Sequence, residues 1–150
     1  MYLWEKEYTD TLFSHFLIMK GFHGNIEALT LENTAFRKVL YTQKHAQLVL
    51  MSLKVGEDIG EETHTGTEQF FRFESGSWKA YIDGNEYTLD AGTALIVPAG
   101  AKHNIINTSN SELLKMYTIY SPAHHLDGII RNTKAEAQAS APEFDGVTTE

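Results

Sequence analysis

Hydrophobic and polar residues alternate along most of the chain between residues 36 and 120. Successive side chains of a β-strand point to opposite faces, so this alternation indicates strands with one buried face. The segments that carry the pattern are short and rich in β-branched and aromatic residues. They are residues 37–42, 46–54, 68–75, 78–83, 85–90, 93–99, 102–107 and 113–120. Because no helical pattern separates these strands, they predict an all-β sandwich or barrel.

The N-terminal residues follow a different period. Leu12, Phe13, Phe16 and Leu17 recur at helical spacing after Asp10, which is a residue type that caps helices well. We therefore expect a short amphipathic helix in an N-terminal extension that packs on the barrel or on a partner. Met19 is an alternative translation start within this segment.

The alternating pattern ends after Tyr120. Residues 121–132 read as a loop, and residues 133–140 have the composition of a short helix. Residues 141–150 are polar and are expected to form a tail.

Composition narrows the class of protein. The chain has 150 residues, which is the length of one domain, and 42% of them are hydrophobic. It has no cysteine, which excludes disulfides, thiolate metal sites and a cysteine nucleophile. Its formal net charge of −8 argues against nucleic acid or an anionic membrane as a partner. No apolar run is long enough to span a bilayer, and the N-terminus lacks the features of a signal peptide, so we expect a cytoplasmic protein.

Several polar residues fall on strand faces that should point inward. Glu62 and His64 are two residues apart, so in a strand they share a face. Gln69 shares a face with Phe71 and Phe73 at the start of the next long strand. Burying these polar side chains together is costly unless something satisfies them, and a cation does so directly.

His103 adds a further ligand to this set. It follows the turn Pro98-Ala99-Gly100 at the start of another apolar strand. Two histidines and a carboxylate form a set of ligands that non-haem iron favours, and imidazole also suits zinc and nickel. Gln69 would be a fourth, neutral and weaker oxygen ligand. The alternative interpretation is that these residues are exposed and belong to turns.

Other candidate residues have simpler interpretations. His45 at a strand end is expected on the surface, although it could line a cavity. The adjacent His124 and His125 are expected to be solvent-exposed in a loop, with gating of the barrel mouth as the alternative. Tyr81 and Tyr117 are either packing residues, which we favour, or general acids, and Trp78 is either a pocket wall or core.

The spacing of five residues resembles a known family. Gly92, Pro98, Gly100, His103 and Asn107 match the second motif of the cupins, G-x5-P-x-G-x2-H-x3-N. The first cupin motif, G-x5-H-x-H-x3-4-E-x6-G, is matched less well. Its positions correspond to Gly56, Glu62, His64, Gln69 and Gly76, so a glutamate replaces the first histidine and a glutamine replaces the glutamate. Within the family, the chain looks like small single-domain bacterial cupins that are labelled mannose-6-phosphate isomerase-like.

The resemblance implies a single jelly-roll β-barrel over residues 21–131, between an N-terminal helical extension (1–20) and a C-terminal helix and polar tail (132–150). It implies one divalent metal ion, zinc, iron, manganese or nickel, held by Glu62, His64, Gln69 and His103. Glu62 could instead act as a catalytic base if it is not a ligand. The interior would be a small, largely apolar pocket lined by Phe71, Phe73, Val49, Met51 and Ile105.

The implied function is that of a small-molecule metalloenzyme with isomerase, lyase or dioxygenase chemistry on a compact, oxygen-bearing substrate. The alternatives are a cupin that binds a metal or small ligand without catalysis, and a sensor or partner module. We also expect a homodimer, because the apolar side chains of residues 1–20 would not remain in water on an unsupported helix, and because cupin barrels commonly pair.

Overall fold

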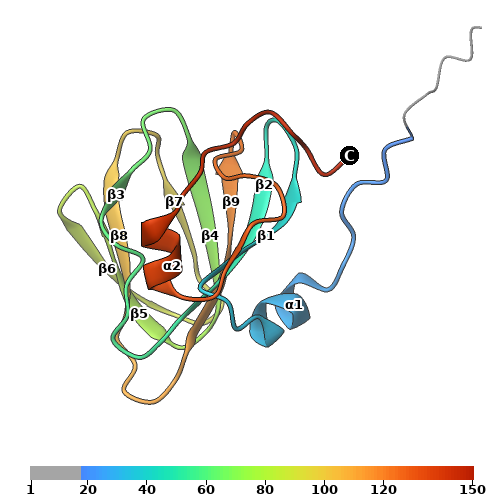
Figure 1. The fold of residues 1–150 in the computed structure, drawn as a ribbon. Coiled ribbons are helices and arrows are strands. Elements are labelled where there is room, and N and C mark those ends of the chain that lie inside the picture. Colours follow the sequence, from blue (N-terminus) through green and yellow to red (C-terminus); the bar gives the residue numbers. More distant parts are fainter. Residues whose placement is uncertain (1–17) are drawn as a thin grey trace, which may run out of the picture.

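Two antiparallel β-sheets face each other in the computed structural model, which describes residues 18–150 (Figure 1). The helices are α1 (Ile26–Glu32) and α2 (Lys134–Ala139). The strands are β1 (Arg37–Thr42), β2 (Gln47–Leu53), β3 (Glu62–Thr63), β4 (Glu68–Ser75), β5 (Ser77–Ile82), β6 (Asn85–Asp90), β7 (Ala94–Val97), β8 (Lys102–Asn107), β9 (Leu114–Ser121) and β10 (Ile130–Arg131).

The strand order identifies a jelly roll. One sheet has the order β10-β1-β2-β9-β4-β7 and the other has the order β3-β8-β5-β6. Strands far apart in sequence pair in both sheets, since β2 lies beside β9 and β3 lies beside β8. These crossovers wrap the chain into a double-sheet barrel. The predicted all-β jelly-roll architecture is therefore confirmed.

Each predicted segment contains a strand, and four segments match at both ends: 37–42, 68–75, 85–90 and 102–107. Strand β7 ends at Val97 because Pro98 has no N–H to donate to a neighbouring strand. The alternation did not reveal β3 or β10, because a strand of two residues is too short to show a period.

Helix α1 was not predicted from the sequence. The side chain of Asn25 accepts a hydrogen bond from the Ala28 N–H at 3.1 Å, which caps the helix. The helix packs against β9, β4 and β2, and Thr30 is fully buried there. An asparagine cap followed by the acidic first-turn residue Glu27 was the available signal.

The side chains that point into the barrel form layers that change from apolar to polar along the strands. Directly opposed residues of β2, β9 and β4 make up each layer. The first layer contains Met51, Met116 and Phe73, the next contains Val49, Thr118 and Phe71, and the last contains Gln47, Tyr120 and Gln69. All nine residues are buried. The barrel therefore has an apolar end that supplies the core and a polar end that can hold a site.

The apolar end is filled by side chains and does not form a pocket wall. Phe73 stacks on Trp78 with ring centroids 4.3 Å apart, and Trp78 is fully buried. The predicted lining residues Phe71, Phe73, Val49, Met51 and Ile105 are at most 1% exposed and all belong to the core cluster. The prediction that they line a small apolar pocket is therefore wrong, because aromatic stacking and close packing occupy that space.

The C-terminal residues cover the barrel. Helix α2, which confirms the predicted helical turns, packs beside β10 and buries Ala137 in the core, and Lys134 pairs with Asp58. The expected polar tail is held against the barrel, because the Phe144 N–H donates to the His124 carbonyl at 2.9 Å. Further along, the Thr149 N–H donates to the Thr42 carbonyl at 3.0 Å.

The predicted N-terminal helix, with Leu12, Phe13, Phe16 and Leu17, lies outside the described residues. The homodimer expected from it stays a prediction. None of the helices described between residues 18 and 150 has the length and apolar character needed to cross a membrane.

Asn107, the last residue of the second motif, ties the turns at the apolar end together. Its side-chain amide donates to the carbonyls of Leu53, Lys54 and Glu112 at 2.9–3.1 Å and accepts from the Ser109 N–H at 3.0 Å. The residue is 1% exposed. Its role in the motif is therefore structural.

We expect Asn107→Ala to lower the free energy of unfolding by about 2 kcal/mol, because it leaves buried carbonyls without a donor. Urea unfolding followed by circular dichroism measures this change. Asn110→Ala, at an exposed position of the same loop, is the control and should change stability by less than about 0.5 kcal/mol. Equal unfolding midpoints for the two variants would contradict the structural role.

Candidate metal centre

The tight corner at residues 98–101 positions two histidines. Gly100 has a φ of +84°, which L-residues rarely adopt, and its N–H donates to the His64 carbonyl at 2.8 Å. The Ala101 N–H donates to the Pro98 carbonyl at 3.1 Å and closes the turn. The Ala101 carbonyl in turn accepts a hydrogen bond from Nδ1 of His103 at 3.1 Å. The corner thus holds the backbone of His64 and the ring of His103 in place.

The hydrogen bond to Ala101 determines the tautomer of His103. A carbonyl only accepts, so Nδ1 carries the proton and Nε2 of the neutral ring has a free lone pair. Burial lowers the pKa of His103 and outweighs the opposing effects of the Ala101 bond and the nearby Glu62 charge. The 2% exposed ring is therefore neutral near pH 7 and presents a ligand atom to the barrel interior.

Gln69 faces this lone pair. Its Oε1 lies 3.2 Å from Nε2 of His103, and its own Nε2 is buried without a hydrogen-bond partner in the described part of the chain. Two acceptors therefore point at each other. A flip of the Gln69 amide would let its NH2 group donate to His103. A cation would satisfy Oε1 of Gln69 and Nε2 of His103 without a flip. A separation of 3.2 Å suits neighbouring ligands of one ion at about 2.1 Å, so these residues fit a metal ion.

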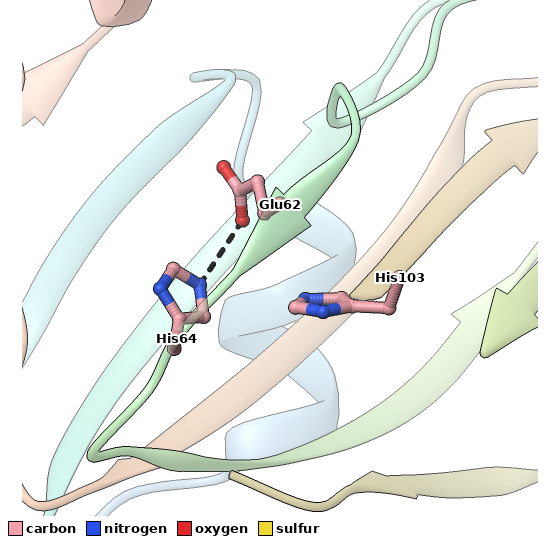
Figure 2. Close-up of side chains that lie close together, drawn as sticks. All are labelled: Glu62, His64 and His103. Atoms are coloured by element: carbon pink, nitrogen blue, oxygen red, sulfur yellow. Dashed lines mark hydrogen bonds and ion pairs between the residues drawn. The ribbon is translucent and has the colours of Figure 1, made fainter. Parts of the chain in front are cut away.

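Glu62 and His64 complete the cluster. Glu62 lies directly opposite His103 in the β3–β8 register, so their side chains share a face. Nε2 of His64 lies 3.2 Å from Oε2 of Glu62, and the ligand atoms of Glu62, His64 and His103 all lie within 4.8 Å of one another (Figure 2). Ligands on opposite sides of one ion are about 4.2 Å apart at the usual bond lengths. A small closure would therefore let these three residues share an ion.

The Glu62 carboxyl is ionised despite its location. Burial opposes ionisation, but the hydrogen bond with His64 and the charge of Arg37 outweigh it and lower the pKa of Glu62. Its side chain is 25% exposed and that of His64 is 11% exposed, so the cluster is reachable from outside.

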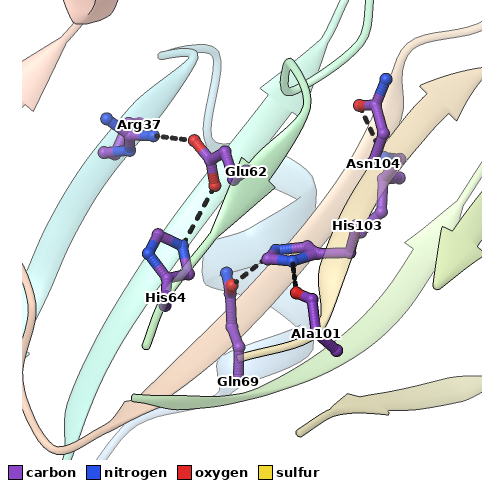
Figure 3. A network of polar contacts seen from close by, with 8 residues as sticks. Arg37, Glu62, His64, Gln69, Ala101, His103 and Asn104 are labelled. Carbon is purple, nitrogen blue, oxygen red and sulfur yellow. Dashed lines mark hydrogen bonds and ion pairs between the residues drawn. The ribbon is translucent and has the colours of Figure 1, made fainter. Parts of the chain in front are cut away.

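Arg37 is a site residue that the sequence analysis missed. It lies in β1 and is 6% exposed, and its Nη2 is 3.7 Å from Oε1 of Glu62. Figure 3 shows its side chain reaching from β1 toward Glu62, where it faces one carboxylate oxygen while His64 faces the other. Arginine usually lies on the surface, but Arg37 shares a strand face with the buried Val39, and this alternation was the available signal.

The expectation that His124 and His125 are solvent-exposed is wrong. His125 is 5% exposed, and His124 is half-buried with its ring 4.3 Å from that of His64 and stacked on Tyr120 at 5.4 Å. The side chain of Gln47 accepts from both backbone N–H groups and folds this loop over the polar end of the barrel. Burial, then the charge of Arg37, lowers the pKa of His125 to about 2.

The remaining candidates lie away from the cluster or in the core. His45 is exposed, as expected. Tyr81 donates to Glu86 at 2.8 Å on the surface, and Tyr117 packs on Phe70. Trp78 is a core residue.

A pocket of about 310 Å³ opens beside His64. Its walls include His124 and the hydroxyl-bearing segment 63–67, and the C-terminal residues Glu143 and Phe144 close one side. The docked tail therefore helps to form the access route. This lining is polar, in contrast to the apolar pocket expected from the sequence.

Comparisons with known proteins agree with this fold. The family described as "Cupin domain" matches residues 49–120. YrkC of Bacillus subtilis is 43% identical over 128 residues, which cover 81% of this chain and 68% of that protein. Protein L612 of Acanthamoeba polyphaga mimivirus is 47% identical over 109 residues, which cover 71% of this chain and 68% of that protein.

A solved structure extends the comparison to three dimensions. BH2720 from Bacillus halodurans superposes with a TM-score of 0.79 at 40% sequence identity. The match covers 81% of this chain and 96% of that one.

Gly100→Ala tests the corner. A Cβ at Gly100 would meet nothing within 4 Å, so the cost arises from the positive φ alone. We expect a loss of about 1 kcal/mol in the free energy of unfolding. Gly66→Ala is the control, because its Cβ also meets nothing within 4 Å and its φ is not positive. If the two variants unfold at the same urea concentration, the corner is not strained for an L-residue.

His125 should make the protein sensitive to acid. With a folded pKa of about 2, it stays neutral while the unfolded chain takes up a proton below about pH 6.5. Stability should therefore fall as the pH falls, by about 1.4 kcal/mol between about pH 7.5 and about pH 5.5 for this group alone.

We expect His125→Phe to lose that part of the acid sensitivity, as measured by urea unfolding at each pH. His45→Gln, at an exposed position, should follow the wild-type protein. A wild-type slope in His125→Phe would show that His125 does not contribute to the pH dependence.

Proposed function

The chain belongs to the cupin superfamily, and on this premise we propose that it binds one divalent metal ion and acts on a compact, oxygen-bearing small molecule. The ligands would be Glu62, His64, Gln69 and His103. The narrower resemblance to mannose-6-phosphate isomerase-like cupins supports the fold but does not identify a substrate.

The observation that carries this proposal is the convergence of acceptor atoms. Nε2 of His103 has a lone pair because the Ala101 carbonyl holds the proton on Nδ1, and that lone pair faces Oε1 of Gln69 at 3.2 Å. The Glu62 carboxylate and the His64 ring lie on the same side of the barrel within ligand range. Nε2 of His103 and Oε1 of Gln69 are buried acceptors that face each other, which is unfavourable without a cation and favourable with one.

The donor set restricts the metal. Two imidazole nitrogens and two oxygens, without a thiolate, suit iron, zinc, manganese or nickel. Such an ion, when bound, supplies Lewis acidity toward a carbonyl or hydroxyl oxygen, or redox chemistry in the case of iron.

The residues around the ligands define the rest of the site. A lowered pKa makes the Glu62 carboxylate a weak base, so we assign it as a ligand and not as the catalytic base. His124 borders the pocket, and burial lowers its pKa, so its neutral ring can accept or donate one hydrogen bond. Thr63, Thr65 and Thr67 line the same pocket and offer hydroxyl groups to an oxygen-bearing substrate.

A metal-binding cupin without catalysis is the second candidate. The nearness of Gln69 to His103 favours it, because a fourth protein ligand leaves less room for substrate. The pocket beside His64 favours the enzyme. A crystal structure of the metal-loaded protein decides between them by showing whether a coordination position faces this pocket.

His103→Ala should abolish stoichiometric metal binding while the fold survives, because the apolar layers of the barrel do not depend on the ion. Elemental analysis and titration calorimetry with Zn²⁺ and Mn²⁺ measure binding, and circular dichroism monitors the fold. His45→Ala, which removes an exposed histidine, should bind metal like the wild-type protein.

Two results would count against the metal centre. One is a wild-type protein that binds neither ion after removal of purification metals. The other is undiminished binding in His103→Ala. Loss of the β-sheet signal together with the metal would instead indicate a structural ion.

A further inference from the structure

Arg37 is a buried cation whose hydrogen-bonding capacity is largely unused. Its side chain is 7% exposed, and its Nε is buried without a hydrogen-bond partner among the described residues. The contact with Glu62 is long at 3.7 Å and uses one edge of the guanidinium. An unpartnered buried donor is costly, so this group is suited to a ligand that accepts from it.

A second pocket leads to this arginine. It has a volume of about 250 Å³ and is lined by residues of β1, of the segment that leads into β3, and of α2. Phe36, Arg37, Ile59, Glu62 and Ala137 are among its lining residues. Apolar side chains thus surround a guanidinium and a carboxylate, and the volume is below the usual range for drug-sized ligands. The pocket suits a short molecule with one charged end.

The charges in this pocket make anion binding depend on the metal. Without an ion, the Glu62 carboxylate already offsets the Arg37 guanidinium. Glu61, which also lines this pocket, is exposed and pairs with Lys102 at 2.8 Å, so it adds little to the interior. A divalent cation at the Glu62, His64 and His103 cluster would leave an excess of positive charge that an anion can compensate.

We propose that Arg37 binds the carboxylate of a small substrate whose second oxygen faces the metal centre, so that short hydroxy- or oxo-carboxylates are the substrate class. This inference rests on the metal site proposed above. A carboxylate matches one planar edge of a guanidinium with two parallel hydrogen bonds. A phosphate dianion fits less well, because Arg37 is the single cationic side chain among the residues that line this pocket.

Calorimetry with the metal-loaded full-length protein tests the proposal. The probes are glycolate, lactate and malonate, with glycolamide and lactamide as neutral counterparts and inorganic phosphate as a competing anion. We expect at least one acid to bind at least about tenfold more tightly than the amides and phosphate, which corresponds to about 1.4 kcal/mol. Chelator-treated protein should bind that acid at least about tenfold more weakly, and by linkage the acid should raise metal affinity by the same factor.

Variants separate recognition from structural support. Arg37→Met should lose the preference for acid over amide. It should still take up the metal, because the negative charge of Glu62 is then no longer offset by the Arg37 guanidinium. Arg37→Lys keeps the charge without the fork and should retain part of the preference. Arg72→Met is the matched control, since Arg72 lies in β4 of the same sheet, is 37% exposed and pairs with Glu74. Circular dichroism monitors folding in each case.

The outcomes distinguish this inference from the proposed function. If the wild-type protein binds no metal, both fail. If metal binds but the acids bind no better than the amides, or if Arg37→Met and Arg37→Lys both keep the preference, the carboxylate site is wrong and the metal centre stands. Tighter binding of phosphate than of every acid would also overturn the carboxylate assignment. Arg37→Met with lower stability but an unchanged acid-to-amide ratio would make Arg37 a structural residue.

Discussion

The hydrogen bond from Nδ1 of His103 to the Ala101 carbonyl is the interaction on which the site depends. Such a bond contributes only about 1 kcal/mol to stability. Its larger effect is to fix the proton on one nitrogen, so that the other faces the interior as an acceptor. The same corner donates the Gly100 N–H to His64. One turn therefore aligns two ligands that lie far apart in sequence, and the positive φ at Gly100 makes that turn possible.

The barrel is divided into an apolar and a polar end. Burial of the apolar end offsets the unfavourable free energy of the buried polar groups at this site. The stacked Phe73 and Trp78 at one end lie in a core that extends across both sheets. Near the other end, Nε of Arg37, Nε2 of Gln69 and Nε2 of His125 are buried without partners among residues 18–150, and elsewhere in the barrel the same holds for Nε1 of Trp78 and Oγ1 of Thr118. Each unpartnered polar group costs on the order of 1–3 kcal/mol. Three of these five atoms lie near the proposed site, where a bound ligand can give them partners.

Alternation predicted the strands because each strand has one face in the core, and the spacing of Gly92, Pro98, Gly100 and His103 identified the corner because a turn needs particular residues at fixed offsets. Other features depend on contacts between distant segments. The loop with His124 and His125 is buried because Gln47, far away in sequence, accepts from its backbone. Arg37 lies on the inward face of β1 with Val39, and β3 places a carboxylate near its guanidinium. Neither the burial of the loop nor the contact with Glu62 leaves a local pattern, so sequence reasoning treated both histidines as exposed and overlooked the arginine.

Charge balance links the two proposed ligands of this barrel. A divalent ion close to Glu62 and Arg37 would leave uncompensated positive charge where little water is present, and such charge is costly to bury. Solvent can reduce that cost through the openings beside His64 and Arg37. A small carboxylate compensates one charge and gives the guanidinium the acceptor that it lacks. The cation and the anion therefore stabilise each other. A neutral molecule of the same shape does not compensate the positive charge and gives the guanidinium no charged acceptor. In this site, selectivity for an acid follows from the burial of Arg37 as much as from the metal.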